Sequence, residues 1–279
     1  MKISKQYLHQ QKSNNYKLAD RTSIAGVTTL NVQAAWNEGY TGKGVSVVVV
    51  DDGLEWHHPE IIDSYDPKIS TDLNDDDSDP SPRYDDDNSN KQGTNLAGII
   101  VSKADNFYCG VGVAQGAKIG GVRVLDGNIT DRLESKALSF QKDFVDIYNA
   151  GWGPDDNGKT VDGPGPLTRN TLEEGAKNGR NGKGSIFVWA SGTGGKSMDN
   201  CNCDGYASSI YTIAIGSVSA DGSFPWYAEQ CSASLAVTFS NGVKNEPSLV
   251  TSTLYGKCKV VILKLFFMLK LPTECRRRL

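Results

Sequence analysis

The sequence has little net charge. Its 33 acidic and 29 basic residues leave a formal net charge of −4 over 279 residues. A chain without a strong excess of one sign has no general electrostatic attraction to nucleic acid or to an anionic membrane surface. We therefore expect no nucleic-acid partner, and a membrane partner is not expected either.

Long apolar runs are also scarce. The N-terminal stretch Met1–Lys17 lacks the apolar core that a signal peptide needs. One apolar run, KVVILKLFFMLKL at Lys259–Leu271, is interrupted by two lysines, is too short to span a bilayer and precedes a basic end. A membrane-surface helix is one interpretation of this run. We favour a frameshifted or intron-derived tail, because its composition matches nothing before it.

Zinc-type cysteine spacing is absent. Among the six cysteines, Cys201 and Cys203 are separated by one residue and have no histidine nearby, which is not usual for zinc ligands. Disulfides are favoured instead, and they indicate an oxidising compartment. Because the N-terminus does not resemble a signal peptide, two alternatives stay open. Either the chain is a fragment of a secreted precursor, or its cysteines stay reduced.

Apolar residues alternate between strand-like and helix-like spacing along the chain. Val45–Val50 is almost wholly β-branched and predicts a buried strand, whereas Gly93–Lys103 is apolar at helical spacing. This alternation predicts an α/β fold with a parallel sheet covered on both faces, and no repeat or linker divides the chain. The other predicted helices are Asn31–Glu38, Leu133–Phe140 and Leu167–Asn178, and the other strands are Lys118–Leu125, Phe144–Asn149, Ser185–Ala190, Ile210–Val218 and Leu235–Phe239.

Aspartates concentrate in one short stretch of the sequence, at Asp72, Asp75, Asp76, Asp77, Asp79, Asp85, Asp86 and Asp87. Clustered carboxylates repel one another unless something neutralises them, and hard oxygen ligands suit calcium. The stretch is therefore either a solvated loop or a cation-binding site.

Asp51 and Asp52 directly follow the first predicted strand, at the end where α/β enzymes place reactive groups. They open a series of longer motifs: VDDGLE at 50–55 with His58-Pro59, VRVLDG at 122–127, WGPDD at 152–156, GKTVDGP at 158–164, FVWASG at 187–192, CNCDGY at 201–206, and PWY at 225–227 with Glu229. With these motifs the chain resembles, from about Tyr7 to Cys258, the catalytic domain of the proprotein convertases. These are the furin/kexin-like branch of the subtilisin superfamily of serine endopeptidases.

The resemblance implies a subtilisin-like three-layer α/β domain, with a mainly parallel central sheet flanked by helices and without its C-terminal part. We expect an N-terminal lead-in segment at 1–25, an incomplete subtilisin/kexin-like peptidase domain at 26–258, and an unrelated hydrophobic and basic tail at 259–279.

The resemblance also implies a calcium-dependent enzyme that cuts secretory precursors after paired basic residues with an Asp-His-Ser triad. Asp51 matches the aspartate, but Gln92 stands where the histidine should be, and glutamine cannot cycle a proton near neutral pH. Thr193 stands in place of the asparagine that holds the oxyanion. The serine segment expected after Cys258 is replaced by the tail.

No other residue is expected to restore the triad. His57 and His58 fit surface or turn positions, His9 lies near the N-terminus, and Ser191 has no histidine to activate it. We favour an inactive convertase-like domain, either a pseudo-enzyme or the product of a decaying gene. The alternatives are an active convertase with a misassembled sequence and a non-catalytic module whose acidic cleft binds basic peptides.

The substrate-recognition positions implied by the resemblance are better kept. Asp156 and Asp204 match the pocket for the basic residue before the cut bond, and Asp52 the next position. Glu134, Asp162 and Tyr206 match the more distant pockets, Asp155 keeps an acid, and Trp152 and Gly153 belong to the strand that pairs with substrate. Ser89 replaces an acid and Gly151 replaces a serine. A solvated acidic rim is the alternative.

Calcium ligands and disulfides follow from the same resemblance. One calcium site would use Asp72, Asp77 and Asp79, and a second Asp156, Asp199 and Glu229, whereas a third keeps only Asn106 with Glu60 in place of an aspartate. The implied disulfides are Cys201–Cys231 and Cys109–Cys258, which leaves Cys203 free and Cys275 in the tail. Basic peptides or precursor segments would be the partners, in the secretory pathway.

Overall fold

The computed structural model describes residues 32–219, 221–240 and 249–261. The expected lead-in at 1–25, Cys275 and His9 therefore lie outside the described residues, as does the expected tail beyond residue 261. Among the described residues, no helix has both the length and the apolar character needed to cross a membrane.

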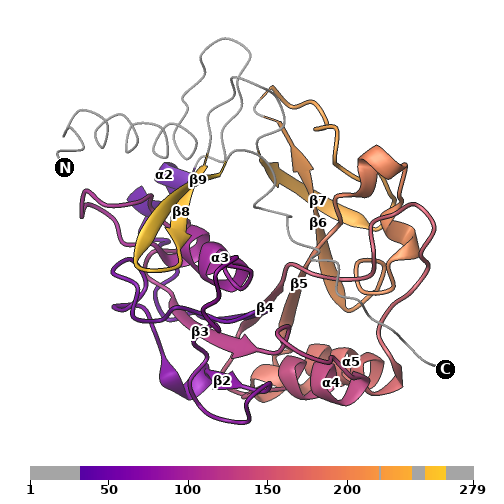
Figure 1. Cartoon of the computed structure of the whole chain (residues 1–279), viewed down its shortest axis with the longest axis horizontal. Helices are drawn as coiled ribbons and strands as arrows, with labels where there is room; N and C mark the ends of the chain where they lie inside the picture. Colours follow the sequence, from indigo (N-terminus) through magenta and orange to yellow (C-terminus); the bar gives the residue numbers. More distant parts are fainter. Residues whose placement is uncertain (1–31, 220, 241–248, 262–279) are drawn as a thin grey trace.

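The centre of the molecule is a seven-stranded sheet in which every neighbouring pair runs parallel (Figure 1). In spatial order the strands are β2 (Thr71–Asp72), β3 (Lys118–Arg123), β1 (Ser46–Asp51), β4 (Ile147–Ala150), β5 (Ile186–Ala190), β6 (Thr212–Val218) and β7 (Ser234–Phe239). The predicted parallel sheet is thus confirmed. Strand order changes direction between β1 and β4, and in open parallel sheets such a switch point places a crevice beyond the carboxyl ends of the two strands.

Helices cover both faces of this sheet, which gives the three predicted layers (Figure 1). Helices α4 (Asp131–Leu138) and α5 (Pro166–Gly182) pack together on one face, and α3 (Gln92–Val101) lies on the other, against β1 and β3. A short helix, α2 (Val32–Asn37), precedes β1. Gly179 leaves helical backbone conformation, with ψ 168°, so the regular part of α5 stops at Asn178, the predicted end.

Strand β1 is buried from Val47 to Asp51, and its valine side chains alternate between two cores. Val48 and Val50 pack with Tyr148 and Trp189 on the α4–α5 side, whereas Val47 and Val49 pack on the α3 side. Each fully buried valine stabilises the fold by roughly 1.5–3 kcal/mol. The run of β-branched residues therefore forms the strand from which Asp51 emerges.

The start of β4 differs from the prediction. The sequence predicts a strand from Phe144, but β4 begins at Ile147. The N–H groups of Phe144 and Val145 instead bond to the carbonyl of Gln141 in a turn. Apolar character alone did not reveal this turn, beside which Val145 is buried.

A two-stranded antiparallel hairpin packs against α3 and was not predicted. Its strands are β8 (Leu249–Thr253) and β9 (Lys257–Val261). The Thr251 hydroxyl donates to the Asn95 carbonyl over 2.7 Å and so joins β8 to α3. Strand β9 continues to Val261, three residues past the boundary expected at residue 258.

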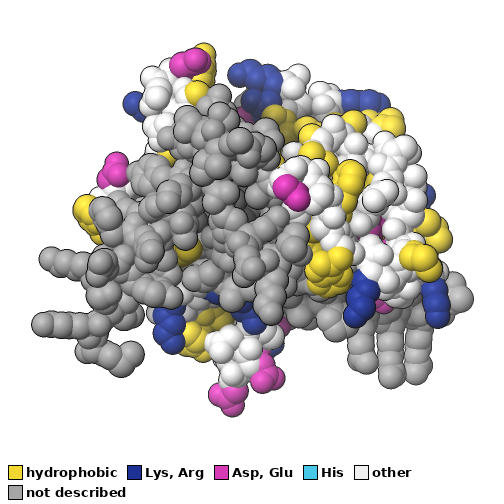
Figure 2. Space-filling view, turned by 90° about the horizontal axis from the view of Figure 1, so that it is seen from above, with side chains coloured by type: hydrophobic (Ala, Val, Ile, Leu, Met, Phe, Trp, Pro, Cys, Tyr) yellow, Lys and Arg dark blue, Asp and Glu magenta, His cyan; other side chains and the backbone are white. Residues whose placement is uncertain are grey.

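The described surface seen from above mixes hydrophobic, basic and acidic side chains (Figure 2). Hydrophobic side chains are conspicuous on the side where Figure 1 places β6 and β7. Exposed apolar residues from these strands and the loop between them are Ile213, Phe224, Trp226, Leu235 and Val237.

Candidate active site

Asp51 ends β1 at the switch point of the sheet and is 1% exposed. Its Oδ1 accepts the N–H of Asp52 over 2.8 Å, whereas no group in the described part of the chain bonds to its Oδ2. Burial, reinforced by the neighbouring charge of Asp52, raises the pKa of Asp51 well above its usual range. Burial therefore disfavours the ionised form of Asp51, which is the form that the aspartate of a working triad adopts.

Gln92 is the first residue of α3 and lies beside Asp51 at the same end of the sheet. Its Nε2 donates to the backbone carbonyl of Gly151, just beyond β4, over 3.0 Å. A Cβ at Gly151 would lie 3.1 Å from this Nε2 and 3.8 Å from Asp51 Oδ2. Gln92 and Gly151, two of the positions where the chain departs from the pattern that the resemblance implies, are thus in contact, and the amide accepts no proton in this arrangement.

Asp52 is also buried, at 1% exposed, and it holds the start of α3. Its two carboxylate oxygens accept the N–H groups of Gln92 and Gly93 over 2.9 and 2.8 Å. Burial raises the pKa of Asp52 to about 6, although these two N–H groups oppose the rise. Both oxygens are therefore engaged with the helix, and the expected contact of Asp52 with substrate stays a prediction.

The other polar candidates predicted from the sequence are His57, His58 and Ser191. His58 is fully buried, its Nδ1 accepts the N–H of Glu60 over 3.1 Å, and its Nε2 lies 2.9 Å from the Lys257 carbonyl. Burial lowers the pKa of His58, which favours the neutral ring. His57 is exposed with its ring edge-on to Trp56, and Ser191 is buried.

Thr193, at the position expected to hold an oxyanion, contacts Asp156. Its N–H and its hydroxyl both donate to Asp156 Oδ2, over 2.8 and 3.1 Å. The hydroxyl is thus directed toward the carboxylate of the predicted specificity pocket. Thr193 and Asp156, two predicted site residues, are thus bonded to each other.

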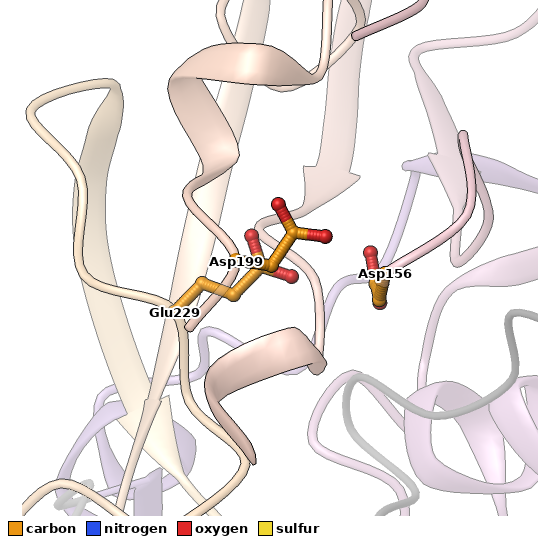
Figure 3. A group of neighbouring side chains, drawn as sticks. All are labelled: Asp156, Asp199 and Glu229. Carbon is orange, nitrogen blue, oxygen red and sulfur yellow. The ribbon is translucent and has the colours of Figure 1, made fainter. Parts of the chain in front are cut away.

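Three carboxylates from separate segments converge beside Thr193 (Figure 3). Oxygen atoms of Asp156, Asp199 and Glu229 lie within 4.8 Å of one another, and this is the one such acidic group among the described residues. The N–H of Gly194 donates to Glu229 over 2.8 Å. Gly192, at φ +103°, fits this cradle because a Cβ there would lie 2.2 Å from Glu229 Oε1. Carboxylates this close repel one another, and the hard oxygen set suits a calcium ion.

The residues of the predicted distant pockets are connected but mostly buried. The Tyr206 hydroxyl donates to Glu134 over 2.7 Å, and the two residues are 4% and 8% exposed. Asp204 accepts the N–H groups of Tyr206 and Ala207, and a backbone bridge joins Asp204 to Asp162. These acids thus form one network, in which Asp162 keeps a half-exposed side chain.

The predicted strand Trp152–Gly153 continues β4 past its last paired residue. The Trp152 ring is buried against Trp189 and Tyr206, and its Nε1 donates to the Val50 carbonyl over 2.8 Å. Asp155, by contrast, is exposed. The side chain of Trp152 therefore stabilises the core, while the acid that follows it reaches solvent.

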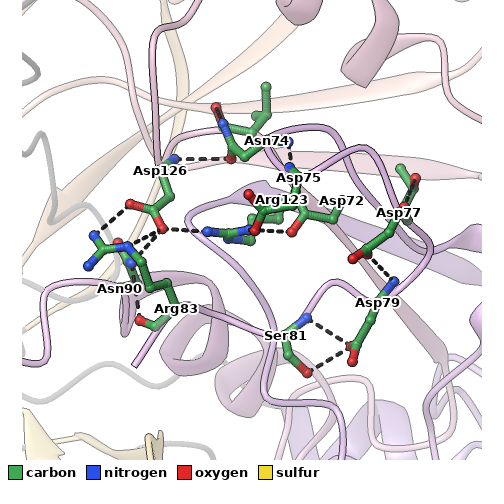
Figure 4. A network of polar contacts seen from close by, with 12 residues as sticks. Asp72, Asn74, Asp75, Asp77, Asp79, Ser81, Arg83, Asn90, Arg123 and Asp126 are labelled. Atoms are coloured by element: carbon green, nitrogen blue, oxygen red, sulfur yellow. Dashed lines mark hydrogen bonds and ion pairs between the residues drawn. The ribbon is translucent and has the colours of Figure 1, made fainter. Parts of the chain in front are cut away.

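The first predicted calcium set is arranged differently (Figure 4). Asp72 is buried and forms an ion pair with Arg123, while Asp77 and Asp79 are exposed. Asp79 Oδ1 accepts the Trp56 indole N–H and the Ser81 hydroxyl, over 2.9 and 2.8 Å. The structure does not bring these three carboxylates together as it does the second set.

Arg123 lies in the motif VRVLDG at 122–127, but the sequence predicted no role for it. It pairs with Asp72, with Asp75 at 2.6 Å and with Asp126 at 2.5 Å, and its side chain is 4% exposed (Figure 4). Arg83 pairs with the same Asp126 at 2.8 Å from the solvent side. Two aspartates of the acidic stretch, Asp72 and Asp75, are thus paired with a buried arginine, which a count of aspartates could not reveal.

Two weaker predicted positions also have close neighbours. Glu60 accepts a hydrogen bond from Asn106, so the two remaining members of the third calcium set are in contact. Ser89 donates to Asp85 through its hydroxyl and its N–H. Asp85 therefore places an acid next to Ser89, at whose position the resemblance predicts an acid.

The cysteines pair as the resemblance implies. Cys109 is joined to Cys258 and Cys201 to Cys231, with Cα–Cα distances of 5.1 and 5.5 Å. Cys203 is free and half-buried. The first bridge fixes hairpin β8–β9 to the loop after α3, and the second links two loops near Asp199 and Glu229.

Comparison with known proteins agrees with this geometry. The model of the subtilase family, peptidase S8, matches residues 42–262. Human furin is 50% identical over 250 residues, 89% of this chain and 32% of furin. Human proprotein convertase subtilisin/kexin type 6 is 54% identical over 229 residues, 82% of this chain and 24% of the relative. Furin-like protease 1 (isoform 1-CRR) of Drosophila melanogaster is 53% identical over 235 residues, 84% of this chain and 21% of the relative. The chain thus spans about a third or less of these relatives' length.

Solved structures share the fold at lower identity. The serine protease of Aeromonas sobria in complex with its chaperone superposes with a TM-score of 0.73 at 22% identity, covering 86% of this chain and 44% of that one. A protease from Pseudoalteromonas arctica superposes with a TM-score of 0.69 at 19% identity, covering 90% and 78%. The matched family model and the three-layer parallel fold show that the chain belongs to the subtilase family, on the branch of the furin-like proprotein convertases.

Proposed function

We propose that this chain is a convertase-like domain that does not hydrolyse peptide bonds. The observation that carries the proposal is the contact of Gln92 with Gly151 beside a buried Asp51. In the subtilase reaction a histidine removes the proton of the attacking serine, and a glutamine amide has no basic nitrogen for this step. The sequence after Cys258 also reads KVVILK, with no Gly-Thr-Ser-Ala segment there.

We further propose that the domain binds basic segments of precursor proteins. The acids at Asp155, Asp156, Asp162 and Asp204 support this proposal, because carboxylates select arginine and lysine side chains. Asp155 is exposed, and Asp156 and Asp162 are half-exposed, so a basic side chain could reach them from solvent. The relatives named as proprotein convertases make precursor segments the natural substrate class to test.

Calcium would serve this recognition site. Asp156, Asp199 and Glu229 would hold the ion, which would neutralise three converging carboxylates and fix the loops that carry them. Because Asp156 belongs both to this group and to the predicted specificity pocket, peptide binding should depend on calcium. The two disulfides and the convertase relatives support a location in the secretory pathway.

Calorimetry with an arginine-rich peptide tests this recognition. We expect heat of binding in calcium, less heat in a chelator, and little heat with a peptide in which citrulline replaces arginine. Asp156→Asn should weaken binding at least tenfold, because it removes a charge from both the pocket and the calcium group. Equal heats with and without calcium would rule out the calcium-dependent site.

A further inference from the structure

A second pocket, with a volume of about 450 Å³, opens between the turn after β1 and the tip of hairpin β8–β9. None of its residues belongs to the triad positions, the acidic recognition set or the carboxylate group of Figure 3. Its lining residues are Glu55, His57, Pro59, Tyr84, Tyr255 and Gly256.

Glu55 forms the floor of this pocket. Its carboxylate is 1% exposed and accepts the N–H groups of Gly256 and Tyr255 over 2.6 and 2.7 Å, and the Tyr84 hydroxyl over 3.0 Å. Within the described part of the chain Glu55 forms no ion pair. A buried carboxylate without a cation is costly, so the floor of the pocket attracts positive charge.

Two tyrosines form the walls. Tyr84 and Tyr255 are 41% and 52% exposed, with ring centroids 5.3 Å apart and planes tilted by 40°. The ring of Tyr255 already attracts a cation, because Lys257 Nζ lies 5.3 Å from its centroid. Aromatic faces within about 6 Å of a cation attract it through their quadrupole. The walls and the floor therefore select for the same charge.

Tyr255 adopts an unfavourable backbone conformation to occupy this wall. It has φ +63°, in the left-handed region, as does the glycine that follows it. The two N–H groups form a nest around Glu55, which explains the backbone conformation. It does not explain a bulky tyrosine, because asparagine adopts this region more easily than tyrosine does. An unfavourable residue with an exposed ring points to a role for the ring itself.

We propose that this pocket binds the guanidinium group of an arginine side chain from a partner peptide. A guanidinium is weakly hydrated and stacks on aromatic faces, which suits the two tyrosines better than a compact ammonium does. A carboxylate offers about four acceptor positions, of which Glu55 has three occupied by the bonds described above. One position remains for a guanidinium N–H. The site needs no calcium and is independent of the function proposed above.

The test is an NMR titration of the full chain in a chelator with N-acetyl-arginine methylamide, and with the citrulline analogue, which has the same shape without the charge. We expect millimolar binding of the arginine compound and at least fivefold weaker binding of the citrulline compound, as about 1 kcal/mol of cation–π attraction gives. Equal binding of the two compounds would overturn the proposal. Tighter binding of tetramethylammonium than of the arginine compound would overturn the choice of guanidinium.

Variants at Tyr255 separate binding from folding. Tyr255→Phe keeps the ring and should bind normally. Tyr255→Asn should lose at least fivefold in affinity without lowering the thermal midpoint, because asparagine relieves the backbone cost. Asp156→Asn, in the other site, should leave this binding unchanged. Wild-type affinity of Tyr255→Asn, or loss of affinity in Asp156→Asn, would contradict a separate pocket.

Discussion

Gln92 Nε2 and the carbonyl oxygen of Gly151 are 3.0 Å apart. This bond joins the first residue of α3 to the residue that follows β4. The resemblance to the convertases predicts a histidine and a serine at these two positions. A side chain on residue 151 would crowd Gln92 and, at 3.2 Å, Leu96 Cδ1. Glycine at position 151 therefore leaves room for the Gln92 side chain, which is the expected result if residue 151 changed together with residue 92.

This fit predicts non-additive stability changes. Gly151→Ser should destabilise the chain by about 1–2 kcal/mol, because its Cβ crowds two neighbours. In a Gln92→Ala background the same serine should cost at least about 0.5 kcal/mol less, because one of those neighbours has been removed. Urea unfolding of the two single variants and the double variant measures this coupling. Strict additivity would show that Gln92 and Gly151 do not depend on each other.

Calcium should raise the thermal midpoint of unfolding. An ion held by Asp156, Asp199 and Glu229 would stabilise the chain by about 2.7 kcal/mol at 100 times its dissociation constant. Glu229→Gln should remove most of this shift, because it deletes a ligand charge from the converging group. The matched control is Glu174→Gln, which changes an exposed residue of α5 and should keep the full calcium response. A response that survives Glu229→Gln would place the ion elsewhere.

Arg123 should be the more important of the two arginines in the acidic network. Arg123→Met leaves Asp72 and Asp126 poorly exposed and without their buried partner, so we expect a loss of about 3–5 kcal/mol. Arg83→Met removes a side chain that is 53% exposed, and exposed pairs are worth about 1 kcal/mol or less. Equal losses in chemical denaturation would contradict the structural role given to Arg123.

The Asp52 carboxyl should make stability depend on pH in an unusual direction. Its folded pKa of about 6 lies above the ordinary value of 3.8, so the folded state binds the proton more tightly. Its stabilising contribution is full below about pH 3.8 and is lost as pH rises through about 6. The free energy of unfolding of Asp52→Asn, relative to that of wild type, should therefore rise between pH 4 and 6.5 by on the order of 1–3 kcal/mol.

Unfolding curves at pH 4, 5 and 6.5 measure this difference. The comparison between the two proteins cancels carboxyls of the opposite sign, such as Asp126, whose pKa is lowered by Arg83 and Arg123 despite partial burial. A pH-independent difference between wild type and Asp52→Asn would show that Asp52 has an ordinary pKa.

The bridge between Cys109 and Cys258 should dominate the contribution of the cysteines. It closes a separation of 149 residues, and loss of a disulfide of this kind costs roughly 2–5 kcal/mol. Replacing both residues by serine should lower the thermal midpoint and loosen hairpin β8–β9, measured by hydrogen exchange of its amides. Cys203→Ser changes a free thiol and should have little effect. A large effect of Cys203→Ser would contradict the observed pairing.

Local patterns in the sequence were enough to predict most of the sheet. The β-branched run before Asp51 predicts β1 because both of its faces are buried, and the helical spacing after Gln92 predicts α3. The motifs also located the carboxylates that converge in Figure 3, although they are far apart in sequence.

Features that depend on long-range contacts were not predictable in the same way. The ion pair of Arg123 with Asp72 and the capping of α3 by Asp52 each join residues at least 40 positions apart. Hairpin β8–β9 was missed because part of β9 was assigned to the apolar tail that follows it. The pocket lined by Tyr255 is formed partly by that hairpin, so no local sequence pattern predicts the pocket.

Hydrolysis of a fluorogenic peptide with paired basic residues tests the central claim most directly. The full chain is assayed with calcium and with a chelator, beside Gln92→His and Asp51→Asn. We predict no turnover above the buffer rate for wild type, and none for Gln92→His, because a histidine alone supplies no nucleophile. Calcium-dependent turnover by wild type that is abolished in Asp51→Asn would contradict the account and identify an active convertase.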